Sequence, residues 1–173
     1  MQGNLSFFFL EGSYQVDPHT LIVDVYGNIK ISGDFPSFFC PAEIAQIMGG
    51  KKFGTVTGDF IMQSQSMETL EGSPDYVGGD FNISYNKIKS LDSCPTFIGG
   101  DFVVTENAIE SPVANHPLNL KGDVFLYSNP LGDKFENEED ERKVFKDILL
   151  YFNSCSEPAR SWEVYNRVES FFF

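Results

Sequence analysis

Basic residues are scarce in this chain of 173 residues, where 12 Lys and Arg stand against 25 Asp and Glu and leave a net charge of −13. A protein that grips nucleic acid through general electrostatics needs clustered Lys and Arg. This balance therefore argues against direct nucleic-acid binding and against attachment to an anionic membrane surface. It permits a basic partner, including a protein that itself normally binds nucleic acid.

Long apolar runs and paired cysteines are also missing. No run approaches the roughly 18 residues of a membrane span. Residues 1–10 place no Lys or Arg before their short apolar stretch, so we expect neither a membrane helix nor a secretory signal. The three cysteines are far apart and form no CxxC and no zinc spacing with a histidine: Cys40, Cys94 and Cys155. We interpret them as reduced thiols of a cytoplasmic protein.

Signatures of catalysis are absent from the sequence. His19 and His116 lie beside prolines, and neither has a partner at metal-ligand spacing. Gly-Gly-Asp-Phe at 78–81 and 99–102 is similar to the GGDEF signature of cyclic-dinucleotide synthesis, but it lacks the second acidic residue and returns at a fixed period, which marks a turn. We expect no enzyme, no cofactor and no metal. The alternative is an enzyme whose site lies in the N-terminal unit or the C-terminal cap, outside any motif.

What the chain does have is an internal repeat. Gly-Asp-Phe or Gly-Asp-Val begins at residues 58, 79, 100 and 122, at intervals of 21, 21 and 22 residues. Each tripeptide opens an alternation of two apolar residues, and an amide follows five residues after the first of them: Gln65, Asn86, Asn107 and Asn129. A weaker first unit starts at Asn28, and its longer return leg contains a segment, 41–48, that predicts a short helix.

Each unit predicts one short strand with one buried face, because apolar residues alternate in it. The glycines before the strand indicate a tight turn, and a Pro-containing leg returns the chain. Stacked parallel strands lie about 4.8 Å apart, so the amide can turn inward and bond backbone groups of the neighbouring coil. One coil cannot bury its face alone, but a stack buries a continuous core.

The segment 77–88, VGGDFNISYNKI, resembles the leucine-rich-repeat unit LxxLxLxxNxL, with its first apolar residue displaced by one and Phe in place of Leu at the strand start. The short period with Pro in the return leg resembles the bacterial short-repeat subclass of secreted effectors. The GGDF…N…SL…P pattern also resembles small leucine-rich-repeat proteins of tailed bacteriophages. The resemblance implies a solenoid. For the phage proteins it implies a protein that binds and modulates or inhibits a host or defence protein in the bacterial cytoplasm.

The predicted fold is a single domain of the α+β solenoid class, a leucine-rich-repeat-like stack of short parallel strands. Its parts are an N-terminal β cap over 1–27, four to five repeats over 28–131, and a C-terminal helical cap over 132–173. In the β cap we expect a hairpin and a strand closed by Tyr26-Gly27-Asn28. In the helical cap we expect helices over 137–152 and from Ser156-Glu157-Pro158, which would cover the last strand edge.

Residues between the buried positions of each strand should face outward and form three columns along the sheet. The first column is Asn28, Asp59, Asp80, Asp101 and Asp123. The second column is Lys30, Ile61, Asn82, Val103 and Phe125. The third column is Ser32, Gln63, Ser84, Thr105 and Tyr127.

The aspartates of the first column are the sharpest feature of the sequence. Unit charges about 5 Å apart repel by roughly 1 kcal/mol in water, and like charges opposite each other on strands are unfavourable. Two explanations stay open. The aspartates form an acidic row that receives Lys, Arg or a cation, or each aspartate accepts hydrogen bonds from turn N–H groups after its glycine.

Apolar residues should gather at one end of the sheet face, where Val103, Phe125 and Tyr127 lie on adjacent strands as binding anchors, unless the C-terminal helices fold over them. The predicted function is non-enzymatic protein binding through one face: Asp59, Asp80, Asp101, Val103, Asp123, Phe125 and Tyr127. Two other functions stay open. One is an acidic mimic of nucleic acid that occupies a basic groove, and the other is a structural component of a virion.

Overall fold

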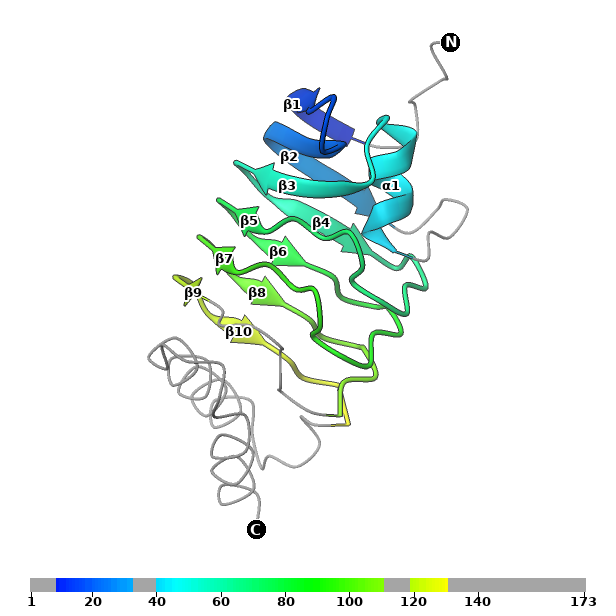
Figure 1. Ribbon diagram of the computed structural model, residues 1–173. Helices are drawn as coiled ribbons and strands as arrows, with labels where there is room; N and C mark the ends of the chain where they lie inside the picture. The colour runs from blue at the N-terminus through cyan, green and yellow to red at the C-terminus, as the bar shows by residue number, and fades with distance from the viewer. Residues whose placement is uncertain (1–8, 33–39, 111–118, 131–173) are drawn as a thin grey trace, which may run out of the picture.

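Short parallel strands, stacked coil on coil, form the body of the molecule (Figure 1). The computed structural model describes residues 9–32, 40–110 and 119–130. The strands are β1 (Phe9–Val16), β2 (Ile22–Ser32), β3 (Lys52–Val56), β4 (Phe60–Gln63), β5 (Tyr76–Val77), β6 (Phe81–Asn82), β7 (Phe97–Ile98), β8 (Phe102–Val103), β9 (Asn119–Leu120) and β10 (Val124–Phe125). Their order in the sheet is β10-β8-β6-β4-β2-β3-β5-β7-β9, and β1 pairs with β2. The solenoid-like stack expected from the repeat is present.

Each coil contributes two short strands that meet at a corner, where the sequence pattern predicted one strand. β5 ends at Val77, the corner is Gly78-Gly79-Asp80, and β6 begins at Phe81. β2 spans both sides of the corner, since its N-terminal part pairs with β3 and its C-terminal part with β4. We call β3, β5, β7 and β9 the first limb, and β4, β6, β8 and β10 the second limb.

The register within the second limb is the one that the repeat predicts. Phe60, Phe81 and Phe102 lie opposite one another on consecutive strands, and Val103 lies opposite Phe125. The first two predicted columns are therefore aligned along the stack.

The N-terminal unit is a single hairpin in which β1 runs antiparallel to β2 over its whole length. β2 continues through Tyr26-Gly27-Asn28 to Ser32, so the prediction that this tripeptide closes a separate strand was wrong. Gly12 lies opposite Gly27, with φ angles of 127° and 147° that favour glycine. Both glycines lie where the hairpin bends from the first limb to the second.

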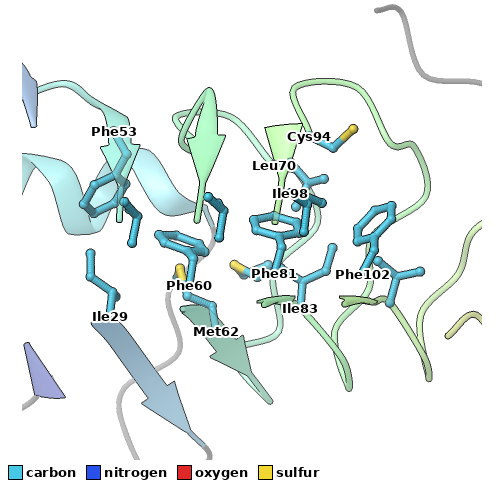
Figure 2. Packing of buried hydrophobic residues seen from close by; sticks show 14 of the residues in the cluster. Ile29, Phe53, Phe60, Met62, Leu70, Phe81, Ile83, Cys94, Ile98 and Phe102 are labelled. Carbon is cyan, nitrogen blue, oxygen red and sulfur yellow. The ribbon is translucent and has the colours of Figure 1, made fainter. Parts of the chain in front are cut away.

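Apolar side chains of both limbs fill the inside of the coils (Figure 2). Phe60, Phe81 and Phe102 are fully buried, and the centroids of consecutive rings are 5.6 and 5.7 Å apart. The first limb contributes fully buried residues from β3, β5 and β7: Phe53, Val56, Val77 and Ile98. Full burial of a Phe side chain is worth roughly 1.5–3 kcal/mol, so the ring that each coil adds to the stack contributes substantially to stability.

The amides predicted to tie the coils together form what we call the Asn ladder: Asn86, Asn107 and Asn129. The Oδ1 of Asn86 accepts two backbone N–H groups of the preceding coil at 2.9 and 3.1 Å. Its Nδ2 donates to carbonyls of the preceding coil and of its own coil at 2.9 and 2.8 Å. Asn107 and Asn129 each accept one N–H of the preceding coil and donate to carbonyls of the preceding coil and of their own. The predicted structural role is confirmed for these three amides, whereas the side chain of Gln65 donates within its own coil.

Helix α1 (Pro41–Ile47) confirms the helix predicted in the first return leg, and Ile44 and Ala45 of this helix are buried in the core. The helices predicted over 137–152 and from Ser156 lie outside the described residues, as does the whole of the predicted cap over 132–173. No helix in the described part of the chain has the length and apolar character that crossing a membrane requires.

Candidate functional site

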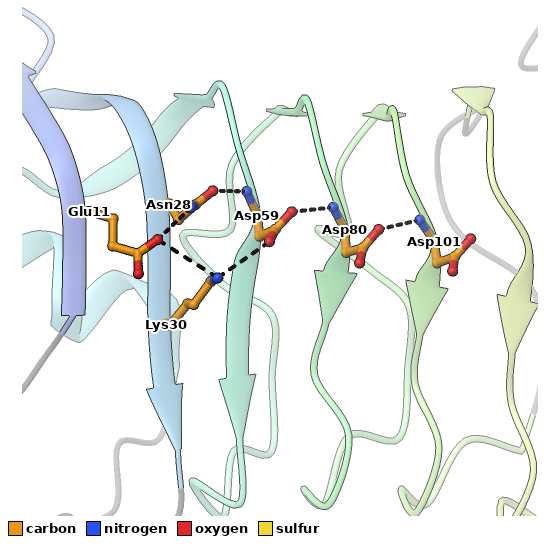
Figure 3. Close-up of polar contacts among 6 residues, drawn as sticks. All are labelled: Glu11, Asn28, Lys30, Asp59, Asp80 and Asp101. Atoms are coloured by element: carbon orange, nitrogen blue, oxygen red, sulfur yellow. Dashed lines mark hydrogen bonds and ion pairs between the residues drawn. The ribbon is translucent and has the colours of Figure 1, made fainter.

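The corner residues of successive coils form a continuous hydrogen-bonded series (Figure 3). The backbone N–H of each corner residue donates to the Oδ1 of the corner residue one coil earlier. The distances are 2.7 Å from Asp59 to Asn28, 3.1 Å from Asp80 to Asp59, 2.8 Å from Asp101 to Asp80 and 2.9 Å from Asp123 to Asp101. We call Asp59, Asp80, Asp101 and Asp123 the Asp row. The carboxylates of Asp59, Asp80 and Asp101 accept backbone N–H groups, as one explanation predicted, but the donor belongs to the next coil instead of the same turn.

The glycines before each aspartate make room for this bonding. A Cβ on Gly79 or Gly100 would collide with the Oδ1 of the preceding aspartate and with the backbone of the preceding coil. A Cβ on Gly78 or Gly99 would come equally close to a backbone carbonyl oxygen of the preceding coil. Gly-Gly-Asp is therefore one structural unit, in which two residues without side chains let the coils approach and the third ties them together.

One carboxylate of the Asp row already holds an ammonium group. Lys30 Nζ lies 3.6 Å from Asp59 Oδ2 and 3.8 Å from Glu11 Oε2. Farther along the row, the Oδ2 atoms of Asp80 and Asp101 have no ion pair or hydrogen bond among the residues that the structure describes. Both residues are half-buried, so part of each remains accessible to solvent.

The apolar residues predicted beside the Asp row lie where the register places them. Val103 and Phe125 are opposite each other and half-buried. Tyr127 lies just past β10, with 38% of its surface exposed. The helices predicted to fold over these residues lie outside the described ranges.

The third predicted column does not face outward as a whole, because Ser84 and Thr105 each keep only 2% of their surface exposed. β6 ends at Asn82 and β8 ends at Val103, and the chain then turns at positions of positive φ such as Tyr85, at 59°. The strand alternation that predicted outward side chains stops before these positions. The outward face therefore consists of the first two columns, together with the exposed Tyr127 and the half-buried Gln63 from the third.

A pair of stacked aromatic rings on the first limb was not among the predicted site residues. The centroids of Tyr76 and Phe97 are 4.5 Å apart with an interplanar angle of 2°, and Tyr76 is 41% exposed. Lys121 Nζ lies 5.9 Å from the centroid of the Phe97 ring, within cation–π reach. A signal for this pair was present, since the two residues are one repeat apart and each precedes the buried apolar residue of its coil.

Cys94 is the one cysteine whose environment in the described residues bears on thiol reactivity. Cys94 is buried, and burial raises the pKa of its thiol to about 12, with a smaller effect from the nearby charge of Asp92. A thiol this far from ionisation at neutral pH is inert, which agrees with the structural role predicted for it. Cys40 stands directly before α1, and Cys155 lies outside the described residues.

The predicted absence of a metal site concerns mainly His19 and His116, and His116 lies outside the described residues. The N–H groups of Thr20 and His19 donate to Asp17 Oδ1, which lowers the pKa of Asp17 and holds His19 in an exposed turn. Within the described ranges, no group of His, Cys, Asp and Glu side chains is arranged to hold a metal ion.

Comparison of the chain with protein-family models, with curated proteins and with solved structures found no match. The geometry of the Asp row therefore carries the functional argument.

Proposed function

We propose that this chain is a non-enzymatic protein-binding module that holds a partner rich in Lys and Arg on the outer face of its second limb. The binding face consists of the Asp row with Val103, Phe125 and Tyr127. One observation carries the proposal: the chain's own Lys30 places Nζ 3.6 Å from Asp59 Oδ2. A partner's cation would make the same contact at Asp80 and Asp101, whose outer oxygens have no ion pair or hydrogen bond among the described residues.

The carboxylates of the Asp row are preorganised for such a partner. The Oδ1 atoms of Asp59, Asp80 and Asp101 each accept a backbone N–H of the next coil, so these carboxylates lose little conformational freedom on binding. Neighbouring carboxylates on strands about 4.8 Å apart repel by roughly 1 kcal/mol in water. A cation placed between two of them relieves that repulsion.

The apolar residues at the end of the face have a separate role. Charges accelerate and orient encounter, whereas buried aromatic contacts slow dissociation. Val103 and Phe125 lie opposite each other on adjacent strands, so the register brings two apolar residues together beside the Asp row.

The class of partner follows from the resemblance of the repeat to small leucine-rich-repeat proteins of tailed bacteriophages. It supports a partner in the bacterial cytoplasm, either a host protein or a defence protein, whose activity the chain modulates or inhibits. A protein that normally binds DNA or RNA meets the charge requirement, since its own binding surface is basic.

Affinity capture from a bacterial lysate tests this proposal, with the natural chain and the double variant Asp80→Asn with Asp101→Asn as baits. Asparagine can replace aspartate at these positions. Asn28 occupies the equivalent corner one coil before Asp59 and accepts its N–H at 2.7 Å. The variant therefore removes two charges and keeps the hydrogen-bonded series. We expect capture of the partner to fall by about tenfold or more, with slower association and a weaker salt dependence in binding experiments on the purified pair.

The control is the pair Lys89→Ala with Glu110→Ala on the exposed return legs, which should leave capture intact. Phe125→Ala should mainly speed dissociation, because the charges that guide encounter are unchanged. A partner that is captured equally by the Asp80 and Asp101 variant, and is lost with the return-leg pair, would place the site on the opposite surface and overturn the proposal.

A further inference from the structure

β1 is an open strand edge at the outer end of the stack (Figure 1). It is 8 residues long, and in the part of the chain that the structure describes β2 is the only strand that pairs with it. Residues 11–15 of this strand are exposed. An exposed edge of this length is a template for another strand.

The hydrogen bonds of β2 reveal which groups of β1 point to the open edge. The odd-numbered residues of β2 bond toward the two limbs: Ile29 N–H donates to the carbonyl of Asp59, and the carbonyl of Val25 accepts from Thr57. The even-numbered residues of β2 therefore face β1, and the residues opposite them in β1 are odd-numbered. Alternate residues of an antiparallel strand bond to its neighbour. The residues of β1 that direct N–H and C=O groups outward are thus Leu10, Gly12, Tyr14 and Val16.

β1 carries none of the usual features that keep strand edges from pairing. It contains no Lys and no Pro, and its register with β2 has no bulge. Its one charged residue, Glu11, is already engaged within the chain, by Asn28 Nδ2 at 2.7 Å and by Lys30 Nζ at 3.8 Å. The edge of a chain with net charge −13 is therefore almost neutral.

The apolar residues at even-numbered positions of β1 form a row on the side of the strand that faces the core. Leu10 and Val16 pack against the core cluster. Tyr14 lies between them, opposite the buried Val25, and still keeps 39% of its surface exposed. A further strand with the same pattern would cover this ring.

We propose that a second copy of this chain occupies the open edge, so that two β1 strands pair antiparallel across a two-fold axis. The outward groups require even-numbered residues to lie opposite even-numbered residues. The bend selects the register, because Gly12 and Gly27 mark the level at which the hairpin passes between limbs, and a second β1 must bend at the same level. Gly12 then lies opposite Gly12 of the second copy, Leu10 opposite Tyr14, and Glu11 opposite Ser13.

This register suits both charge and packing. Glu11 meets Ser13 of the second copy instead of another carboxylate, and each Tyr14 ring covers a Leu10 side chain across the axis. Such a self-complementary contact is the usual form of a two-fold dimer. A single strand pair is a small interface, so we expect dissociation constants on the order of tens of micromolar.

The salt dependence separates the dimer from the proposed binding of a basic partner, on which it does not depend. Each copy carries a net charge of −13, so added salt screens the repulsion between copies and should strengthen the dimer. Binding of a Lys-rich partner to the Asp row should weaken with the same addition. One proposal can therefore fail while the other holds.

Sedimentation equilibrium of the full chain, over a range of concentrations and at two salt concentrations, tests the proposal. We expect a monomer–dimer equilibrium that moves toward dimer with salt. Tyr14→Pro removes an N–H that the chain itself does not use, which an edge strand tolerates. It should weaken dimerisation by about tenfold or more, since two symmetric hydrogen bonds and two ring contacts are lost.

A second variant acts in the opposite direction. Ser13→Lys places an ammonium group opposite Glu11 of the second copy and should tighten the dimer severalfold. The control Glu110→Gln changes the net charge by the same one unit on an exposed return leg and should have a much smaller effect. Natural chain that stays monomeric at about 1 mM, or a Ser13→Lys variant that matches Glu110→Gln, would overturn the proposal.

Oxidative cross-linking tests the register itself. Glu11→Cys with Ser13→Cys puts two thiols opposite each other in a pair without direct hydrogen bonds, where Cα atoms are about 4.5 Å apart and a disulfide fits. We expect a covalent dimer linked from position 11 of one copy to position 13 of the other, identified by peptide mass. Glu11→Cys with Gln15→Cys is the control for a register shifted by two residues. Faster cross-linking of that control would show that the bend does not set the register.

Discussion

The Asn ladder inside the coils and the Asp row at their corners tie neighbouring coils together in two different ways. Asn86 uses both polar atoms of its amide in bonds to backbone groups, and only 9% of its surface is exposed. Asp80 accepts one N–H and keeps a second oxygen without a hydrogen bond among the described residues. A buried polar group must find hydrogen-bond partners within the protein, whereas a surface group can bond to water instead. The same kind of repeat position is therefore purely structural inside, and both structural and available to a partner at the corner.

The largest effect should come from breaking the buried ladder. Asn86→Ala leaves several buried backbone groups without partners, so we expect the free energy of unfolding to fall by about 3 kcal/mol. Asn107 is half-buried, and Asn107→Ala should cost less, roughly 1–3 kcal/mol. Urea denaturation of the two variants measures both values. Thermal and urea unfolding of Asn107→Ala that matched the natural chain would show that the inter-coil bonds contribute nothing.

A methyl group at the corner tests how closely the Asp row depends on glycine. Gly100→Ala puts a Cβ against Asp80 Oδ1 and the backbone of the preceding coil, so we expect a loss of about 2 kcal/mol in the free energy of unfolding. Gly49→Ala is a useful reference for intrinsic glycine effects, because its Cβ would meet nothing within 4 Å although its φ is 90°. The backbone of Gly100 is not in the positive-φ region, so its loss reports the close approach of coils, and a Gly100→Ala variant as stable as the natural chain would show that this approach contributes nothing.

Cys94 is a buried group that becomes charged when its thiol loses a proton at high pH. The pKa of its thiol is raised from 9.0 to about 12 in the folded chain, so the folded state keeps a proton that the unfolded chain loses. The stability due to this thiol is complete below pH 9, and is lost as the pH rises from about 9 to about 12. Between pH 8 and pH 10 the free energy of unfolding should fall by about 1 kcal/mol through this group. Cys94→Val should show a decline that is smaller by this amount.

The smallest effect is expected from removing charge without removing the bond. Asp101→Asn keeps the Oδ1 that accepts the N–H of Asp123 at 2.9 Å, so stability should stay within about 0.5 kcal/mol of the natural chain. Asp101→Ala removes that acceptor and should cost about 1 kcal/mol. If both substitutions cost the same in urea denaturation, the charge of Asp101 and not its hydrogen bond would be the stabilising feature.

The sequence predicted the parts of the fold that recur with full side-chain patterns. The second-limb register and the Asn ladder followed from alternation and from an amide at a constant offset. The first-limb strands were not predicted, because a two-residue strand such as β5, next to two glycines, leaves no alternation to detect. Ser84 was expected on the outer face, and it is buried because the strand ends before it.

The candidate site was predicted in part. Position and spacing placed the aspartates in one row, but sequence alone could not identify the N–H that each one accepts, because that donor belongs to another coil. Sequence alone also could not show which carboxylate Lys30 pairs with. In the structure it pairs with Asp59, and not with Asp80 or Asp101. The stacked pair of Tyr76 and Phe97 could have been found, since both occupy one position of consecutive repeats.

The hydrogen bonds of the Asp row all run in one direction along the stack, so the length of the face is set by the number of repeat units. Each unit receives the carboxylate of the unit before it and offers its own to the unit after it. Duplication of one 21-residue unit would leave the hydrogen bonds at all the remaining corners unchanged. It would lengthen the row by one carboxylate, or about 4.8 Å. If the Asp row binds a basic partner as we propose, the number of units sets how many cations of that partner the row can match.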